Sequence, residues 1–159
     1  MITTKLDHIA FNKVSEPHGW LGNMSPFPII YEGKEWRTTE ALFQAMRYED
    51  EDIKEEIRNE KSPFSSKCKA KKHRHIVNVE MLSEEDVSNM KKCLLLKLEQ
   101  HPYLIKKLID TEGLIIYEDA TARQRGSGLF WGAALIDGEW KGNNVLGNLW
   151  MEIRNKFKE

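Results

Sequence analysis

Residues 38–50 read TTEALFQAMRYED, and this stretch indicates the kind of fold more clearly than any other part of the chain. Either threonine at its start is a good N-cap, and the residues that follow favour a helix. Glu40, Gln44 and Arg47 are spaced i, i+4 and i+7, so they share one face of that helix. In one line, the carboxylate could stabilise a cation, the amide could hydrogen-bond hydroxyls, and the guanidinium could hold a phosphate. The same spacing is also typical of a solvated helix face with a surface ion pair.

Outward from this helix, the sequence predicts short strands and further helices. Residues 5–11 alternate as an edge strand does, and Glu32-Gly33 marks a hairpin turn. Further helices are expected to begin at Ser62-Pro63, at Ser83, after His101-Pro102 and at Asn144, and further strands at 114–119 and 130–136. The expected fold is therefore α+β, a helix-rich single domain over residues 1–159. Its small antiparallel sheet is expected to combine pieces that are not adjacent in the sequence.

The composition is that of an ordinary globular protein with almost no net charge. The 24 Lys and Arg residues nearly balance the 25 Asp and Glu residues, so no overall field draws the protein onto nucleic acid or an anionic membrane. Cys68 and Cys93 form no CxxC pair and no cluster with histidines, which argues against a zinc site. The N-terminus lacks an apolar signal core, and no stretch approaches the ~20 apolar residues of a membrane span. We expect a cytoplasmic protein that needs neither metal nor membrane; its oligomeric state stays open.

Three further segments carry residues that could bind a ligand. Residues 61–75 hold six Lys and Arg residues and no acid, which suits either phosphate binding or an exposed helix attracted to the acidic segment before it. Asn23 lies in a Gly/Pro loop, where it either bonds its own backbone or presents an amide to a ligand. Phe130-Trp131-Gly132 suits stacking on a base, and Gly142–Gly147 suits phosphate binding at a helix start. Alternatively, the Phe130–Gly132 segment supplies a core aromatic residue and the Gly142–Gly147 segment supplies a helix cap.

The order and spacing of these motifs resemble the NADAR family, also called YbiA-like. That family typically reads L-S-N-F, then S-x-E-H-x-F-Q-A-x-K, then S-P-x-x-A-K, then F-W-G, and finally G-x-N-x-L-G. The corresponding segments of this chain are LGNM at 21–24, TTEALFQAMR at 38–47, SPFSSK at 62–67, FWG at 130–132 and GNNVLG at 142–147. The resemblance spans residues 11–154, which is nearly the whole chain.

The resemblance implies an α+β enzyme that cleaves N-glycosidic bonds without a metal or cofactor. One group of the family hydrolyses early riboflavin-pathway intermediates, in which a ribose 5-phosphate is bonded to an aminopyrimidine. Another group acts as an ADP-ribosyl glycohydrolase that removes ADP-ribose from guanine bases in DNA. The family was first proposed to act on NAD or ADP-ribose derivatives. All of these substrates contain a phosphorylated ribose bonded to a nitrogen.

The family's functional positions are carried over residue by residue. They are Asn23 of the L-S-N-F motif, Glu40 and Gln44 of the helix motif, Lys67 of the S-P motif, and Trp131, Gly132, Asn144 and Gly147 at the C-terminal end. Glu40 is then the catalytic carboxylate, which stabilises positive charge on the sugar and takes a proton from water. The amides of Asn23 and Gln44 would orient ribose hydroxyls. Phosphate would be held by Arg47 and Lys67, and Trp131 or Trp20 would stack on the base.

Three departures from the family pattern affect this interpretation. The histidine after the catalytic glutamate is here Ala41, and the helix lysine is Arg47, which keeps the charge but not a nucleophilic amine. The aspartate three residues before the tryptophan of F-W-G is here Gly128. Asp119 is our candidate for the missing carboxylate, which would protonate the leaving nitrogen; alternatively, the loop before Gly128 suits a different leaving group.

The sequence leaves the substrate and the class of function open between several hypotheses. A free riboflavin intermediate needs only a phosphate pocket. ADP-ribosylated DNA needs a basic rim, for which residues 67–74 with Arg123 and Arg125 are candidates. The lost family aspartate favours a rival hypothesis, a non-catalytic module that binds ADP-ribose or a nucleotide. A plain nucleic-acid-binding protein is a third hypothesis, disfavoured by the net charge.

Overall fold

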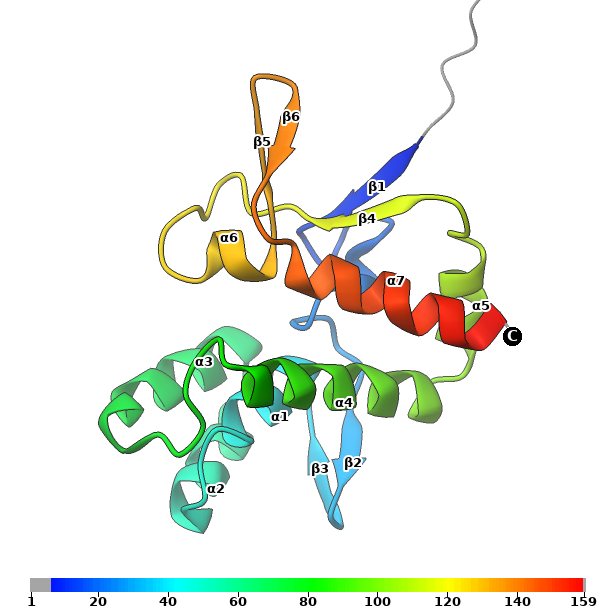
Figure 1. Cartoon of the computed structure of the whole chain (residues 1–159). Coiled ribbons are helices and arrows are strands. Elements are labelled where there is room, and N and C mark those ends of the chain that lie inside the picture. Colours follow the sequence, from blue (N-terminus) through cyan, green and yellow to red (C-terminus); the bar gives the residue numbers. More distant parts are fainter. Residues whose placement is uncertain (1–6, 159) are drawn as a thin grey trace, which may run out of the picture. The chain divides into compact units, whose positions relative to one another are not determined.

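The computed structural model describes residues 7–158, which form two compact units. One unit is the continuous segment Asn23–His101, and the other combines Met1–Gly22 with Pro102–Glu159. In Figure 1 the first runs from light blue to green, and the second contains the dark blue and the yellow-to-red segments. Each unit has its own buried side chains.

The unit Asn23–His101 begins with an antiparallel hairpin of β2 (Ile29–Tyr31) and β3 (Lys34–Trp36). Glu32 and Gly33 form its two-residue turn, with φ angles of 51° and 78°. Both central residues of such a turn need positive φ so that the strands keep their natural twist. The predicted hairpin turn is confirmed.

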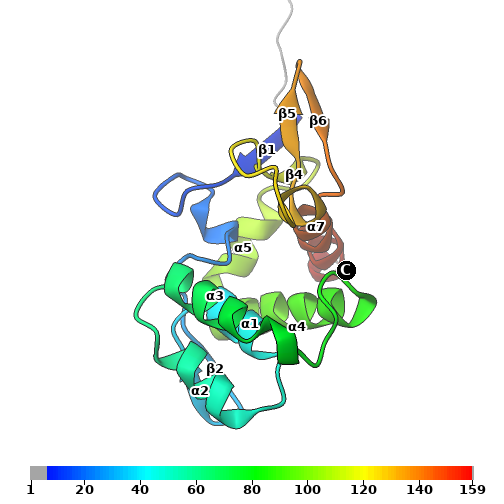
Figure 2. The ribbon, with the colours of Figure 1, turned by 90° about the vertical axis from the view of Figure 1, so that its left-hand side faces the viewer.

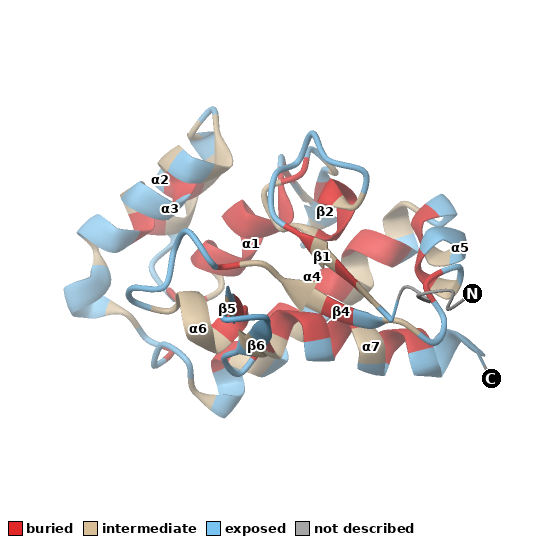
Figure 3. Cartoon of the chain, turned by 90° about the horizontal axis from the view of Figure 1, so that it is seen from above, coloured by how far each residue is buried: buried red, intermediate tan, exposed pale blue. Residues whose placement is uncertain are grey.

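Four α-helices and a short 3₁₀ helix follow the hairpin: α1 (Thr39–Ala45), α2 (Glu51–Asn59), α3 (Pro63–Lys72), η2 (Arg74–Ile76) and α4 (Glu84–Gln100). The predicted caps are confirmed, because Thr38 accepts from the Ala41 amide at 3.1 Å while Ser62 and Ser83 cap α3 and α4. All residues of α1 are buried, as its red colour in Figure 3 indicates. Since α1 packs against α2, α3 and α4, the helix predicted to carry the site is central to this unit (Figures 1 and 2).

The other unit contains a parallel strand pair, two hairpin strands and helices: β1 (His8–Phe11), η1 (Gly19–Leu21), α5 (Tyr103–Ile109), β4 (Ile115–Glu118), α6 (Gly128–Trp131), β5 (Ala134–Ile136), β6 (Glu139–Lys141) and α7 (Val145–Lys158). β1 pairs with β4 in parallel, and β5 pairs with β6 as an antiparallel hairpin. α7 lies along β4 (Figure 1). Its buried side includes Trp150, whose indole donates to the Leu21 carbonyl at 3.0 Å.

The helix-rich α+β class is confirmed, with two differences in the strands. The non-adjacent pieces that pair are β1 and β4, and they are parallel; the antiparallel pairs among the described residues are sequence-local hairpins. The strand predicted over 130–136 was wrong for Phe130 and Trp131, which belong to α6. Residues 5 and 6 of the predicted first strand lie outside the described residues, and the single domain over 1–159 stays a prediction. Between residues 7 and 158, no helix has the length and apolar character needed to cross a membrane.

Candidate functional site

Glu40 lies in the first turn of α1 and is buried, with 8% of its surface exposed. The side chain of Gln44, one turn later, donates from Nε2 to Glu40 Oε1 at 2.9 Å. Arg47, just beyond α1, donates from Nη1 to Gln44 Oε1 at 3.3 Å. The predicted alignment of these three side chains is confirmed. The surface-face alternative is wrong, because Gln44 and Arg47 are only 6% and 7% exposed.

Arg47 forms a buried, two-pronged ion pair with Asp86 of α4. Its Nε and Nη2 atoms lie 2.9 and 2.8 Å from Asp86 Oδ1 and Oδ2, and Asp86 is fully buried. The pairing fixes the guanidinium, which in turn fixes the amide of Gln44 so that its NH₂ group faces Glu40. Phosphate binding by Arg47 stays a prediction, whereas its contact with the Gln44 amide assigns it a positioning role.

Asn23 lies beside the start of α1, because its carbonyl accepts from the Glu40 amide at 3.0 Å. Its side-chain Nδ2 lies 3.1 Å from Met90 Sδ. Its Oδ1 atom is buried and has no hydrogen-bond partner among the described residues. A buried acceptor without a donor is costly, and binding of a ribose hydroxyl by Asn23 stays a prediction.

One face of α4 adds two charged residues that sequence reasoning missed. Asp86, Met90, Cys93 and Lys97 are spaced by four, three and four residues and are all buried. Lys97 donates from Nζ to Ser25 Oγ at 3.0 Å. Burial lowers the pKa of Lys97 to about 7. The signal that could have revealed both residues is their helical spacing with Met90, which places charged side chains on an apolar stripe.

Cys93 indicates how close this face of α4 comes to the carboxylate. Its Sγ lies 3.3 Å from Met46 Sδ. Burial raises the pKa of the Cys93 thiol well above its usual range, and the negative charge of Glu40 raises it further. A thiol held in this neutral form is a poor nucleophile. Cys93 is therefore not a candidate nucleophile, and the catalytic role of Glu40 stays a prediction.

Lys67 is not part of this buried group. It lies on the exposed side of α3, whereas Asn23, Glu40, Gln44 and Arg47 are linked by the contacts described above. Its exposed position gives no geometric support for binding a phosphate. Its phosphate contact stays a prediction.

Two carboxylates follow one another at the end of β4 in the other unit. Asp119 is partly exposed, and its Oδ1 accepts from the backbone amide of Thr121 at 2.9 Å and from the Thr121 hydroxyl. Glu118 is more deeply placed, with its side chain 14% exposed and an oxygen 3.8 Å from Arg123 Nη2. Asp119 thus stabilises a turn, and Glu118 is a second candidate acid that sequence reasoning did not single out.

The C-terminal motif residues hold this unit together. Asn144 accepts from the Glu118 amide at 3.0 Å and donates to the Ile116 carbonyl at 2.8 Å. A Cβ atom added at Gly147 would lie 2.2 Å from the same Ile116 oxygen, so only glycine lets α7 approach β4 this closely. Both residues have a structural role, and a direct contact of either with substrate stays a prediction.

The aromatic candidates of this unit are buried. Trp131 is 8% exposed and meets Phe130 edge-on, with ring centroids 5.0 Å apart. Trp20 is 7% exposed and meets Trp150 edge-on at 6.0 Å. Edge-on packing in a core accounts for both rings without a ligand. Stacking of either ring on a base stays a prediction.

A family model described as NADAR domain matches residues 10–158. The chain belongs to the NADAR family. It is 34% identical over 153 residues to "N-glycosidase YbiA" of Escherichia coli strain K12, covering 94% of this chain and 88% of that protein. It is 33% identical over 151 residues to the protein of the same name from Shigella boydii serotype 4, with the same coverage. The NMR structure of E. coli YbiA matches 98% of this chain and 88% of its own, with a TM-score of 0.80 and 31% identity.

This NADAR domain has a physical reason for glycine at two positions around its F-W-G motif. A Cβ at Gly128 would lie 1.8 Å from the Arg123 carbonyl oxygen, so the family's aspartate cannot stand there while the loop keeps this path. A Cβ at Gly132 would lie 2.6 Å from the Glu118 carbonyl oxygen and 3.2 Å from Glu118 Cγ. Gly132 therefore leaves room for the backbone and side chain of Glu118.

Proposed function

We propose that this NADAR domain is an N-glycosidase that hydrolyses the bond between a phosphorylated ribose and a nitrogen base. The observation that carries the proposal is the buried line of side chains from Glu40 through Gln44 and Arg47 to Asp86. A carboxylate buried at the start of a helix and held by an amide is costly to maintain for stability alone. The name N-glycosidase of the E. coli and Shigella relatives supports the same reaction class.

In the proposed reaction, Glu40 acts on the sugar carbon from which the base departs. The C–N bond breaks with its electron pair going to the base, so positive charge develops on the ribose ring. The carboxylate stabilises this charge and accepts a proton from the water that attacks the carbon. Gln44 donates to only one oxygen of Glu40, which leaves Glu40 Oε2 for the water or the cation. The amide contact also keeps the carboxylate in one orientation.

The remaining residues have supporting roles in the proposal. Asn23, whose backbone carbonyl accepts from the Glu40 amide, orients a ribose hydroxyl through its side-chain amide. Lys67 attracts the phosphate from its exposed position. Asp119 supplies the proton that the departing nitrogen takes up, and Glu118 is its rival for this role. Arg47 and Asp86 act through Gln44 and need not touch the substrate.

Two substrates satisfy this chemistry, and activity assays with each separate them. One is the riboflavin-pathway intermediate with ribose 5-phosphate on an aminopyrimidine, and the other is ADP-ribosylated guanine in DNA. Both place a phosphorylated ribose on a nitrogen base. Chromatography measures turnover of both substrates with the same enzyme preparation, as release of free ribose 5-phosphate from the first and of free ADP-ribose from the second.

The decisive variant is Glu40→Gln, with Glu99→Gln as its matched control on the exposed side of α4. Glu40→Gln keeps the shape of the side chain but removes its charge, so turnover should fall by roughly 100-fold or more while substrate binding persists. Glu99→Gln should leave both unchanged. Binding of ADP-ribose without turnover of either substrate would instead support a non-catalytic nucleotide-binding module. Full turnover by Glu40→Gln would refute the assignment of Glu40.

A further inference from the structure

One side of α3 faces away from the core of its unit and is rich in lysine. Ser66 and Ala70 are buried, which marks the inward side of the helix. Side chains three, four and seven residues apart share one side of a helix, so the opposite side of α3 is an exposed row. We call this row the α3 outer face; its members are Phe64, Lys67, Cys68, Lys71 and Lys72, all of them exposed.

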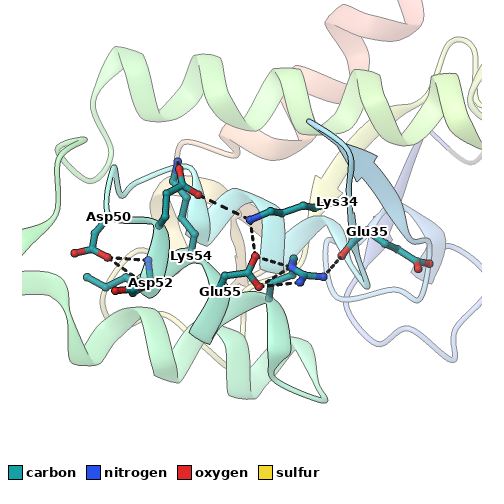
Figure 4. Close-up of polar contacts among 9 residues, drawn as sticks. Lys34, Glu35, Asp50, Asp52, Lys54 and Glu55 are labelled. Carbon is teal, nitrogen blue, oxygen red and sulfur yellow. Dashed lines mark hydrogen bonds and ion pairs between the residues drawn. The ribbon is translucent and has the colours of Figure 1, made fainter.

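The acidic residues at the end of α2 do not neutralise the α3 outer face. They have other partners: Glu55 bonds Lys34 (Figure 4), Glu56 bonds His73, and Glu60 pairs with Lys69. Within residues 7–158, the side chains of Lys67, Lys71 and Lys72 form neither an ion pair nor a hydrogen bond. Attraction to the acidic segment therefore explains only part of the basic segment 61–75. The near-zero net charge of the whole chain does not remove so local a cluster of cations.

Phe64 begins the row of lysines and is 66% exposed. A single exposed apolar side chain is ordinary, but this ring is in line with three unpaired cations. Cations that contact successive phosphates, together with an aromatic ring that stacks on a base, are the features by which proteins bind single-stranded nucleic acid. At a rise of about 1.5 Å per residue, the row from Phe64 to Lys72 is about 12 Å long, enough for roughly three nucleotides.

Two other polyanionic partners fit the α3 outer face less well. An acidic protein segment would pair with the lysines but would leave the aromatic ring without a flat partner. An anionic membrane binds a helix whose apolar side inserts among the lipids, whereas this face has Phe64 as its one large apolar residue. The combination of charge and ring therefore favours a nucleic-acid strand.

We infer that the α3 outer face binds single-stranded nucleic acid without regard to sequence. The lysines contact phosphates, and Phe64 stacks on one base. The inference stands independently of the proposed hydrolysis, because it concerns an unmodified strand. Lys67 takes part in both proposals, so the test relies on Phe64 and Lys71, which have no role in the proposed reaction.

Cys68 lies in the middle of the face and reports on its occupancy. It is exposed, whereas Cys93 is buried, so iodoacetamide should alkylate Cys68 in the folded full chain. An unmodified oligo(dT) of about 12 nucleotides should slow this alkylation in a saturable way, with a Kd on the order of 10 µM at about 50 mM salt. Three phosphate contacts predict that affinity falls about 20-fold between 50 and 200 mM salt. Polyglutamate of similar length and phosphatidylserine vesicles should protect Cys68 much less.

Variants measured by fluorescence anisotropy of the labelled oligonucleotide separate the ring from the charges. Phe64→Leu should weaken binding by about fivefold or more, because stacking on one base is lost, and should leave the salt dependence unchanged. Lys71→Gln should reduce the slope of log affinity against log salt by about 0.7. Phe157→Leu and Lys156→Gln, at exposed residues of α7, are the matched controls and should change neither quantity.

The outcome is separable from that of the proposed catalysis, since Glu40→Gln should bind the oligonucleotide as the parent does. Three results would overturn the inference: an oligonucleotide that fails to protect Cys68 at low salt, equal protection by polyglutamate or by the vesicles, or binding that neither Phe64→Leu nor Lys71→Gln weakens.

Discussion

Replacing Asp86 with leucine is expected to destabilise the protein strongly, because the charge of Arg47 then stays buried without a partner. Asp86 is fully buried and accepts from Arg47 Nε at 2.9 Å and Nη2 at 2.8 Å. It also accepts from the Leu82 amide at 3.0 Å. Since Arg47 is only 7% exposed, water cannot easily replace the lost carboxylate.

The magnitude follows from the burial of both partners. Removing one member of a buried ion pair typically costs about 3–5 kcal/mol of unfolding free energy. For a chain of this length, 1 kcal/mol corresponds to about 2–4 °C in Tm, so Asp86→Leu should melt roughly 6–20 °C below the parent. The double variant Arg47→Met with Asp86→Leu removes both charges, and apolar replacement of a whole buried pair is often neutral. The double variant should therefore recover most of the lost stability.

Urea unfolding and thermal melting, both followed by circular dichroism, measure these differences. Asp110→Leu is the matched control, because the Asp110 carboxylate is 62% exposed where it meets Lys106 at 3.2 Å. Its loss should cost less than about 1 kcal/mol. If Asp86→Leu melts close to the parent, or if the double variant is no more stable than the single one, the argument from buried charge is wrong.

Activity of the double variant separates stability from positioning. Without Arg47, the amide of Gln44 loses the contact that makes its NH₂ group face Glu40. We expect the double variant to be folded but slow, with kcat reduced more than KM is raised. Full activity in a stable double variant would show that Arg47 serves the fold alone.

Three further predictions concern other parts of the chain. Lys97→Met should be more stable than the parent at neutral pH, because the pKa of Lys97 is about 7 in the fold against 10.5 when exposed. Between these two pH values the unfolded parent binds one more proton than the folded parent, so the stability of the parent rises with pH. The stability advantage of Lys97→Met should therefore shrink as pH rises through this range, and a stability difference that does not change with pH would contradict the reasoning. Gly147→Ala should lose about 1–3 kcal/mol in urea unfolding, since its Cβ would meet a carbonyl oxygen of β4 at 2.2 Å; an unchanged midpoint would show that α7 shifts without cost. Asp119→Asn should lower kcat by about 100-fold or more if Asp119 protonates the leaving nitrogen, and the same loss in Glu118→Gln alone would transfer the role to Glu118.

Local sequence determined much of the helix that carries the proposed site. The threonine cap and the spacing of Glu40, Gln44 and Arg47 follow from helix geometry, which places side chains three and four residues apart on one face. The motif order over the chain likewise indicated the NADAR family. Such features depend on neighbouring residues, so they are legible in a sequence before any packing is known.

The tertiary structure decided which of those residues are buried and what they contact. Asp86 lies 39 residues from Arg47, and Lys97 lies 72 residues from Ser25, so no local pattern could pair them. The parallel pairing of β1 with β4, the buried ring of Trp131 and the close approach of α7 to Ile116 at Gly147 are also long-range. Periodicity gives the face of a helix, but only packing gives the partner of that face. Partners in turn decide whether a charge is solvated, paired or held ready for a substrate.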